Sequence, residues 1–210
     1  MDDAARYWDR IAARYARRPV ADEAAYARTL ARARAWLKPG DRALEVGCGT
    51  GATALALAES GAAIHATDVS GEMIAIARAR PEARAAAGVT FAQAALSDPG
   101  VDGPWDAVLA FNFLQLAPDL GLTLTRIAGL VRPGGLLISK TVCLGGRGAW
   151  RYRTIVRAMR PFGVLPNQLA FHGVAALERA VGEAGFEILE RGTFPKAPPS
   201  RFLVARRVGA

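Results

Sequence analysis

The stretch that most constrains the fold is an apolar run over residues 43–46 that ends in three alternating glycines, Gly47, Gly49 and Gly51. An alanine- and leucine-rich segment follows directly, so the pattern predicts a strand, a tight turn and a helix. Glycine lets a backbone turn sharply and approach a ligand closely, because it has no Cβ that would collide with the ligand or forbid a positive φ. The stretch therefore predicts an α/β fold whose glycine loop surrounds a bound molecule.

The spacing of this loop also fits the dinucleotide pattern G-x-G-x-x-G/A, through Gly47, Gly49 and Ala52. Asp68 follows about 20 positions later, where the same pattern places an acidic residue. A carboxylate at that point can accept hydrogen bonds from both hydroxyls of a ribose, since it offers about four lone-pair sites. The loop and Asp68 together predict a ligand that contains a nucleoside.

Glu45 lies inside the strand, and an acid followed by G-x-G-x-G resembles the first motif of the class I S-adenosylmethionine-dependent methyltransferases. In that family the loop holds the methionyl part of S-adenosylmethionine, and an aromatic residue on an N-terminal helix often covers the cofactor. The cofactor-binding residues that the resemblance implies are Trp8, Tyr15, Glu45, Gly47, Cys48, Gly49, Thr50, Gly51, Asp68, Val69, Met73, Ala95, Leu96 and Phe111.

The N-terminal segment over residues 3–17 predicts an amphipathic helix that Pro19 ends. One stripe of this helix carries Tyr7, Trp8, Ile11 and Tyr15, and the opposite stripe carries arginines. We expect residues 1–40 to form a helical lid and residues 41–210 the binding core, within a single domain overall. The alternative that these rings only pack against other helices stays open.

The region after the third expected strand, residues 89–93, departs from the resembled family. Many members have an acidic residue there that binds the adenine amino group, whereas this chain has Ala95 and Leu96, with Asp98 only later. An adenine edge needs one donor and one acceptor, and the main chain supplies both. We therefore expect backbone groups of Ala95 and Leu96 to bind the adenine.

The fourth expected strand, residues 105–111, leads into Asn112-Phe113-Leu114-Gln115. Methylases that act on amino groups of nucleic acids or protein glutamine carry a polar-Pro-Pro-aromatic motif here, and this chain has no proline in it. That argues against a nucleic-acid acceptor and predicts an apolar wall. The acceptor-binding candidates are Phe113, Leu116, Thr141, Tyr152 and Met159. His172 is the candidate catalytic base, with a role at a helix start or on the surface as the alternative.

The C-terminal part supplies a further resemblance. An Arg-Pro-Gly-Gly turn over residues 132–135 precedes a fifth strand at residues 136–141, and two closing strands at residues 186–190 and 201–205 are joined through a proline-rich connection. Strands joined without a helix predict an antiparallel hairpin. We predict a Rossmann-like three-layer α/β sandwich, whose seven-stranded, mostly parallel sheet ends in this hairpin.

Composition narrows the class of protein. The chain has 210 residues, 51% of them hydrophobic, and a net charge of +8. It has no apolar run of about 18 residues and no basic segment before an apolar stretch, so we expect neither a transmembrane span nor a signal peptide. Two cysteines, Cys48 and Cys143, form neither a disulfide framework nor a metal cluster, which favours a cytoplasmic protein without a metal.

We predict methyl transfer to a small or medium-sized, substantially apolar acceptor by in-line displacement. The sulfonium already carries a good leaving group, so the acceptor mainly needs alignment. Three alternatives stay open: an NAD-dependent oxidoreductase, a cofactor-binding protein without activity, and a phospholipid- or quinone-directed methyltransferase in peripheral contact with a membrane. The basic, aromatic stretch over residues 147–160 supports the last. The sequence identifies neither the acceptor nor the oligomeric state.

Overall fold

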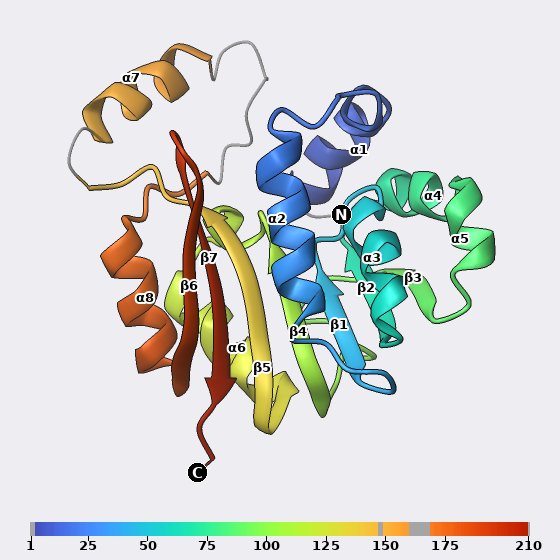
Figure 1. Ribbon diagram of the computed structural model, residues 1–210. Coiled ribbons are helices and arrows are strands. Elements are labelled where there is room, and N and C mark those ends of the chain that lie inside the picture. Colours follow the sequence, from blue (N-terminus) through green and yellow to red (C-terminus); the bar gives the residue numbers. More distant parts are fainter. Residues whose placement is uncertain (1–2, 147–148, 160–168, 210) are drawn as a thin grey trace.

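The computed structural model describes residues 3–146, 149–159 and 169–209. Its strands are β1 (Arg42–Val46), β2 (Ala63–Asp68), β3 (Val89–Gln93), β4 (Trp105–Phe111), β5 (Val131–Val142), β6 (Phe186–Lys196) and β7 (Pro199–Arg207). They form one sheet in the order β3-β2-β1-β4-β5-β7-β6, in which β1 to β5 are parallel and β7 runs antiparallel to both of its neighbours (Figure 1). The predicted fold class is confirmed.

Helices cover both faces of this sheet. They are α1 (Asp3–Ala16), α2 (Glu23–Arg34), α3 (Ala52–Leu57), α4 (Gly71–Ala79), α5 (Pro81–Ala85), α6 (Leu120–Leu130), α7 (Ala149–Met159) and α8 (Val174–Glu183), with short 3-10 turns η1 (Ala58–Ser60) and η2 (Leu114–Leu116). Side-chain caps begin three of them, since Asp22, Ser70 and Asp119 each accept a hydrogen bond from a backbone N–H in the first turn. The third cap, Asp119, begins α6 at Leu120.

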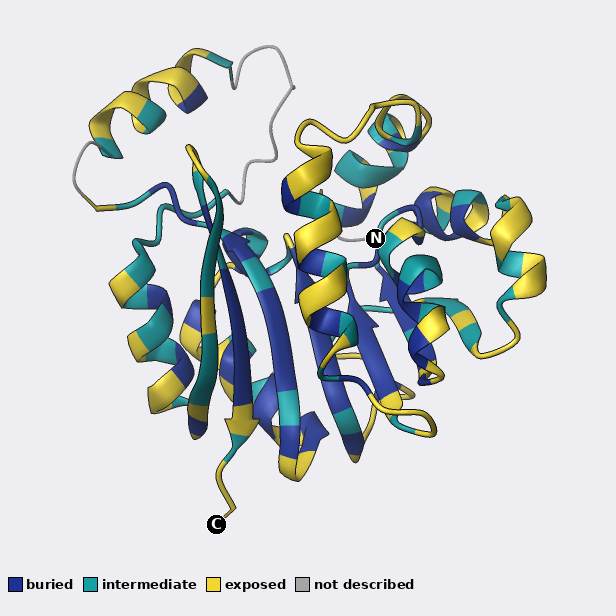
Figure 2. Cartoon of the chain, viewed as in Figure 1, coloured by how far each residue is buried: buried dark blue, intermediate teal, exposed yellow. Residues whose placement is uncertain are grey.

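The core lies on both faces of the central strands. On one face Leu44, Val108 and Leu137 pack with residues of α6 and α8, and on the other face Leu109 and Ile138 pack with residues of α2 and α3. Strands that are buried on both sides read as continuous apolar runs, as residues 107–111 of β4 do. Figure 2 shows these central strands buried along most of their length.

The fifth strand begins earlier than predicted. The Arg-Pro-Gly-Gly segment lies inside β5, because Trp105 pairs with Val131 while Ala107 pairs with Leu136. Residues 132–135 therefore bulge out of the ladder. Arg132 Nε closes this bulge by donating to Asp106 Oδ1 at 2.6 Å. The separate turn that we predicted before the strand is wrong, because a bulge can absorb extra residues without ending the strand.

The closing hairpin is also longer than predicted, because only Ala197 and Pro198 separate β6 from β7. Most of the expected proline-rich connection is strand. Proline is tolerated on an edge strand and at the first residue of a strand. Pro195 lies on the edge strand β6, and Pro199 begins β7.

The two N-terminal helices have different places. α1 lies across the carboxyl ends of the parallel strands and packs on α4, whereas α2 runs along the sheet (Figure 1). Ala33 and Leu37, in and just after α2, are buried in the core. Among the described residues, no helix combines the length and the apolar character that crossing a bilayer requires.

Candidate active site

A cavity of about 520 Å³ lies at the carboxyl ends of β1, β2 and β4, beneath α1. Its size is within the range of small-ligand and cofactor sites. The predicted site residues that line it are Trp8, Tyr15, Glu45, Gly47, Cys48, Gly49, Asp68, Val69, Met73, Ala95, Leu96, Phe111, Phe113 and Leu116. Fourteen predicted residues, far apart in the sequence, thus surround one space.

The glycine loop forms the floor of the cavity. Gly47, Gly49 and Gly51 all have positive φ, at 66°, 54° and 75°, which strongly favours glycine. A Cβ on Gly47 would lie 2.7 Å from the Phe113 ring, and one on Gly51 would lie 2.7 Å from the Phe91 ring. Gly51 and the predicted Thr50 are not among the lining residues. Both residues belong to the loop itself, and the Thr50 carbonyl oxygen accepts a hydrogen bond from Arg80 Nε at 2.7 Å.

Asp68 at the end of β2 is tied to the loop. One carboxylate oxygen, Oδ2, accepts from Gly49 N at 2.9 Å, and Oδ1 accepts from Ser70 N at 2.9 Å. Burial raises the pKa of Asp68, while the hydrogen bonds from Ser70 and Gly49 act in the opposite direction. The two backbone donors fix the carboxylate at the cavity wall and leave it further lone pairs for hydroxyl donors.

Glu45 on β1 is a second buried acid in the cavity wall, with 2% of its surface exposed. Its Oε2 atom has no hydrogen-bond partner within the described part of the chain. Burial first, and the nearby Asp68 second, raise the pKa of Glu45 to about 8. A buried acid with an unpartnered oxygen is costly to keep unless a ligand group pairs with it.

Cys48 also lines the cavity, near both of these acids. Burial, followed by the charges of Glu45 and Asp68, raises the pKa of its thiol. The thiol therefore stays protonated, and a protonated thiol is a poor nucleophile.

The loop after β3 differs in detail from the expectation for adenine. The Ala95 amide donates to Asp98 Oδ2 at 2.8 Å, so this donor is already engaged. The Leu96 carbonyl accepts from Arg126 Nε at 3.3 Å, and the Arg126 guanidinium also pairs with Asp102 at 3.0 Å. The Ala95 carbonyl accepts from Asp98 N at 3.0 Å, so the carbonyls of Ala95 and Leu96 each keep a lone pair to offer to an adenine edge.

Sequence reasoning did not single out Arg126 or Asn112, which also line the cavity. Helical spacing could have indicated Arg126, because it shares one face of α6 with Leu122 and Thr123. Asn112 has φ of +54°, a conformation that asparagine tolerates better than most residues do. Gln115 Nε2 donates a hydrogen bond to the Asn112 carbonyl oxygen at 2.8 Å. Strained backbone of this kind is frequent at ligand sites.

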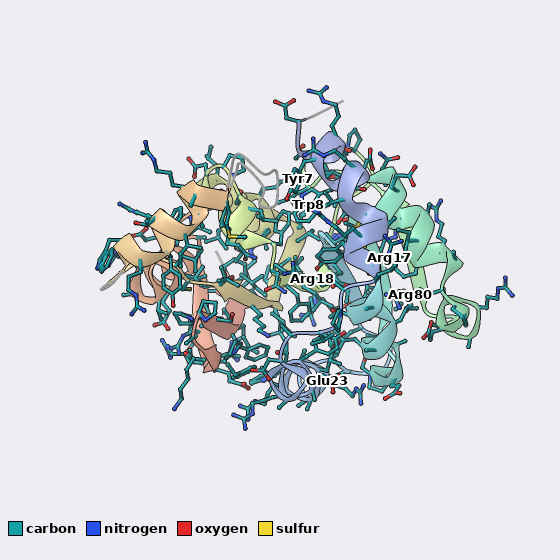
Figure 3. The ribbon with its side chains drawn as sticks, turned by 90° about the horizontal axis from the view of Figure 1, so that it is seen from above. Tyr7, Trp8, Arg17, Arg18, Glu23 and Arg80 are labelled. Carbon is teal, nitrogen blue, oxygen red and sulfur yellow. The ribbon has the colours of Figure 1, made fainter. Side chains whose placement is uncertain are left out.

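Aromatic rings from α1 cover the cavity. Trp8 and Tyr15 meet edge to face, with 6.1 Å between ring centroids. Seen from above, Tyr7 and Trp8 lie on the side of α1 that faces the middle of the molecule (Figure 3). Burial, followed by the nearby Asp68 carboxylate, raises the pKa of Tyr15. The rings of Trp8 and Tyr15 line the cavity, and the Tyr15 ring lies beside the glycine loop, 3.9 Å from where a Cβ on Gly49 would be.

Besides Thr50 and Gly51, four predicted residues are not among those that line this cavity: Thr141, Tyr152, Met159 and His172. Tyr152 and Met159 are half-buried on α7. Thr141 Oγ1 and His172 Nε2 are buried and have no hydrogen-bond partner among the described residues. Arg147 and Arg160, the ends of the basic stretch noted in the sequence, lie outside the described residues.

Solved structures with similar folds include magnesium protoporphyrin IX methyltransferase from Synechocystis PCC 6803 with bound SAM. That structure has a TM-score of 0.73 at 23% identity, and the match covers 99% of this chain and 98% of that one. Another neighbour, the [4+2]-cyclase SpnF, has a TM-score of 0.70 at 22% identity, over 87% of this chain and 81% of that one. At these identities the similarity shows the fold.

Curated relatives match over a shorter length. The ubiquinone biosynthesis O-methyltransferase of Xanthomonas campestris pv. campestris is 32% identical over 106 residues, which are 50% of this chain and 44% of the relative. The magnesium-protoporphyrin O-methyltransferase of Rhodobacter capsulatus is 40% identical over 92 residues, 42% of this chain and 40% of the relative. These matches thus span less than half of either relative.

The family comparison covers far more of the chain. The sequence model of the methyltransferase domain matches residues 14–191, which include the glycine loop, Asp68 and the strands through the start of the closing hairpin. The resemblance drawn from Glu45 and the three glycines is thereby confirmed. The chain belongs to the methyltransferase-domain family.

Proposed function

We propose that this protein transfers a methyl group from S-adenosylmethionine to a small, substantially apolar acceptor. The observation that carries the proposal is the pair of buried acids in the cavity, Asp68 tied to the glycine loop and Glu45 with an unpartnered oxygen. The named methyl transfer by the Xanthomonas and Rhodobacter relatives, and the SAM in the Synechocystis structure, support it.

The two acids suit different parts of that cofactor. Asp68 would accept hydrogen bonds from the ribose hydroxyls, and Glu45 would pair with the positive charge of the methionyl end. When bound, S-adenosylmethionine supplies an electrophilic methyl group on a sulfonium. Gly49, which has no Cβ contact closer than Tyr15 at 3.9 Å, would let the backbone approach the ligand.

Apolar groups dominate the remainder of the lining. Phe113 and Leu116 follow β4, and the rings of Trp8 and Tyr15 would exclude water above them. An apolar acceptor would be held in line with the methyl group by this wall, and alignment is the main requirement of the reaction. We infer a small-molecule acceptor from this lining, because the space is enclosed by the α1 helix.

His172 and Thr141 keep proposed roles as base and acceptor-binding group for an acceptor that extends toward the end of β5. Their buried side-chain atoms without partners among the described residues support this extension. Gly145 N donates to His172 O at 2.9 Å, which holds His172 beside the segment that follows β5. Tyr152 and Met159 on α7 would border the same side. If the rate of methyl transfer by His172→Gln is unchanged across the pH range, His172 is not the base.

We also propose that the lid is narrower than residues 1–40. α1 covers the cavity, whereas α2 places Ala33 and Leu37 in the core. The functional lid is then residues 3–18, and α2 belongs to the layer that packs on the sheet.

Isothermal titration calorimetry tests cofactor binding directly. We expect S-adenosylmethionine and S-adenosylhomocysteine to bind in the micromolar range, about −8 kcal/mol, and NADH not to bind. Tight NADH binding without S-adenosylmethionine binding would contradict the proposal. A screen of acceptors with a labelled methyl donor then distinguishes transfer from binding alone, an outcome that matters because the cyclase neighbour has the same fold.

One observation favours a second candidate, an acceptor taken from a membrane surface. α7 is exposed along much of its length (Figure 2). Trp150 is 71% exposed and Ile155 is 54% exposed, and the charged residues of α7 are all arginines. Aromatic, aliphatic and basic side chains on one short helix suit peripheral contact with anionic lipid. Sedimentation with anionic vesicles, compared with neutral ones, decides between the two.

We place either activity in the cytoplasm, a proposal that the free, buried thiols of Cys48 and Cys143 support.

A further inference from the structure

One stripe of α1 faces α4 and contains Ala5, Asp9 and Ala12, at helical spacings of four and three residues. Both alanines are buried, and their small side chains allow the two helices to approach closely. Asp9 is the polar residue in the middle of this apolar stripe. Trp8 and Tyr15 project from a neighbouring stripe into the cavity.

Asp9 makes two hydrogen bonds to the first turn of α4 and its cap. Its Oδ1 atom accepts from Ser70 Oγ at 2.6 Å and from Glu72 N at 3.2 Å. A carboxylate at a helix N-terminus also interacts favourably with the helix dipole. The contact therefore joins an acid of α1 to the start of a helix in the nucleotide-binding half of the sheet.

Ser70 connects this contact to the candidate ribose site. Its hydroxyl donates to Asp9 and accepts from Met73 N at 3.0 Å, while its backbone N–H donates to Asp68 Oδ1 at 2.9 Å. The same buried residue thus holds Asp68 with one group and Asp9 with another. Asp68 in turn holds Gly49 of the glycine loop.

We propose that Asp9 is a positioning residue, which latches α1 onto Ser70 and so holds Trp8 and Tyr15 over the cofactor cavity. Ser70 already caps α4 through the Met73 amide, so capping that helix does not require Asp9. What Asp9 adds is a connection between α1 and the residue that orients Asp68. The effect on the bound cofactor rests on the proposed function, whereas the latch itself does not.

Two loss variants and two controls test the latch. Asp9→Ala removes both hydrogen bonds, and Asp9→Ser has a side chain too short to reach Ser70. Asp9→Asn keeps an oxygen that accepts from the Ser70 hydroxyl and the Glu72 amide, so it should restore most of the effect. Asp3→Ala removes an exposed acid from the first turn of the same helix, and we expect it to behave as the unaltered protein does.

The first measurement needs no ligand. The four tryptophans can be labelled with 5-fluorotryptophan, and a soluble nitroxide broadens the fluorine signals of exposed rings. Buried Trp105 and exposed Trp150 serve as internal references. In Asp9→Ala and Asp9→Ser we expect broadening of the Trp8 signal to approach that of Trp150, while circular dichroism still shows a folded protein.

The second measurement is the dissociation rate of S-adenosylhomocysteine by stopped flow. Losing hydrogen bonds to a charged group should raise this rate about tenfold in both loss variants. A Trp8 signal and a rate that stay at their unaltered values in folded Asp9→Ala would overturn the latch. If S-adenosylhomocysteine binds to none of the proteins, the proposed function fails, and the Trp8 signal still decides whether Asp9 holds α1.

Discussion

At the scale of single residues, the candidate site depends on two acids in different states. Asp68 has backbone donors on both oxygens, whereas Glu45 has an oxygen without a partner among the described residues and a pKa raised to about 8. Burying Glu45 without a partner for this oxygen therefore costs the ligand-free protein stability. A bound ligand that pairs with the oxygen would remove this cost. These two states lead to different predictions.

For Asp68, replacement by alanine should weaken binding of S-adenosylhomocysteine by about 2–3 kcal/mol, because hydrogen bonds to a charged acceptor are lost. Isothermal titration calorimetry measures the change. Asp41→Asn is the control, since Asp41 precedes β1 at the opposite end of that strand from the cavity. Equal losses in the two variants would contradict the assignment of Asp68 to the ribose.

For Glu45, the raised pKa makes stability depend on pH. Unfolded Glu45 releases its proton above the ordinary value of 4.5, whereas the folded, ligand-free protein keeps it up to about 8. The unfolded state therefore binds fewer protons between these values, and the free energy of unfolding falls as the pH rises through this window. Glu45→Gln cannot ionise, so its melting temperature should exceed that of the unaltered protein by more at pH 8 than at pH 5. Thermal scans at both pH values that show a constant difference would refute this.

At the scale of elements, Asp106 joins three strands at the amino ends of the sheet. Its Oδ2 atom accepts from Arg42 N at 2.8 Å, where β1 begins, and its Oδ1 atom accepts from Arg132 Nε in the β5 bulge. The Arg42 amide, followed by Arg132, lowers the pKa of Asp106. The bulge is therefore held by an acid on the neighbouring strand β4.

Asp106→Asn should lower the free energy of unfolding by about 1 kcal/mol at pH 7. Because the folded pKa is depressed, this stabilisation is present above the ordinary value of 3.8 and is lost as the pH falls through the folded pKa. Urea unfolding at pH 7 and at pH 2.5 measures the decrease, which we expect to shrink at the lower pH. Asp102→Asn, which removes an exposed pair with Arg126, should change stability by less than about 0.5 kcal/mol.

The sequence predicted most where a short pattern dictates the structure. The glycine loop depends on neighbours within a few positions, so it was predictable. Arg126 and Asn112 were missed, because their place depends on which helix face and which loop meet the cavity. The extent of β6 and β7 was underestimated, since whether a proline ends a strand depends on the strand's place in the sheet.

At the scale of the whole molecule, the binding core and the cover over it are distinct parts. The glycine loop, Glu45 and Asp68 belong to the sheet and its first turns, whereas Trp8 and Tyr15 come from α1. We propose that binding of the nucleoside part and exclusion of water fall to different segments of the chain. Removing one segment should separate the two properties.

Deletion of residues 1–18 should leave a folded core that still binds S-adenosylhomocysteine, because Asp68 and the glycine loop are retained. Methyl transfer should be abolished, since the cavity would lose its cover and with it the exclusion of water. Circular dichroism and calorimetry establish folding and binding, and a confirmed acceptor with a labelled methyl donor gives the rate. Transfer at the rate of the full chain would rule out a functional cover.

The prolines of the closing hairpin have a consequence for how molecules meet one another. β6 is an eleven-residue strand at the edge of the sheet, and a long regular edge offers unpaired backbone groups to any other extended chain. Pro195 has no backbone N–H to donate, and the pairing of β6 with β7 shifts register between Thr193 and Lys196. This end of β6 therefore cannot pair continuously with a strand from another molecule. Further along the same strand, Glu190 accepts hydrogen bonds from Arg32 and Trp36, which directs this side chain toward the helical layer. Pro195, which makes this part of the sequence look like a connection, thus also hinders pairing between this edge and a sheet of another molecule.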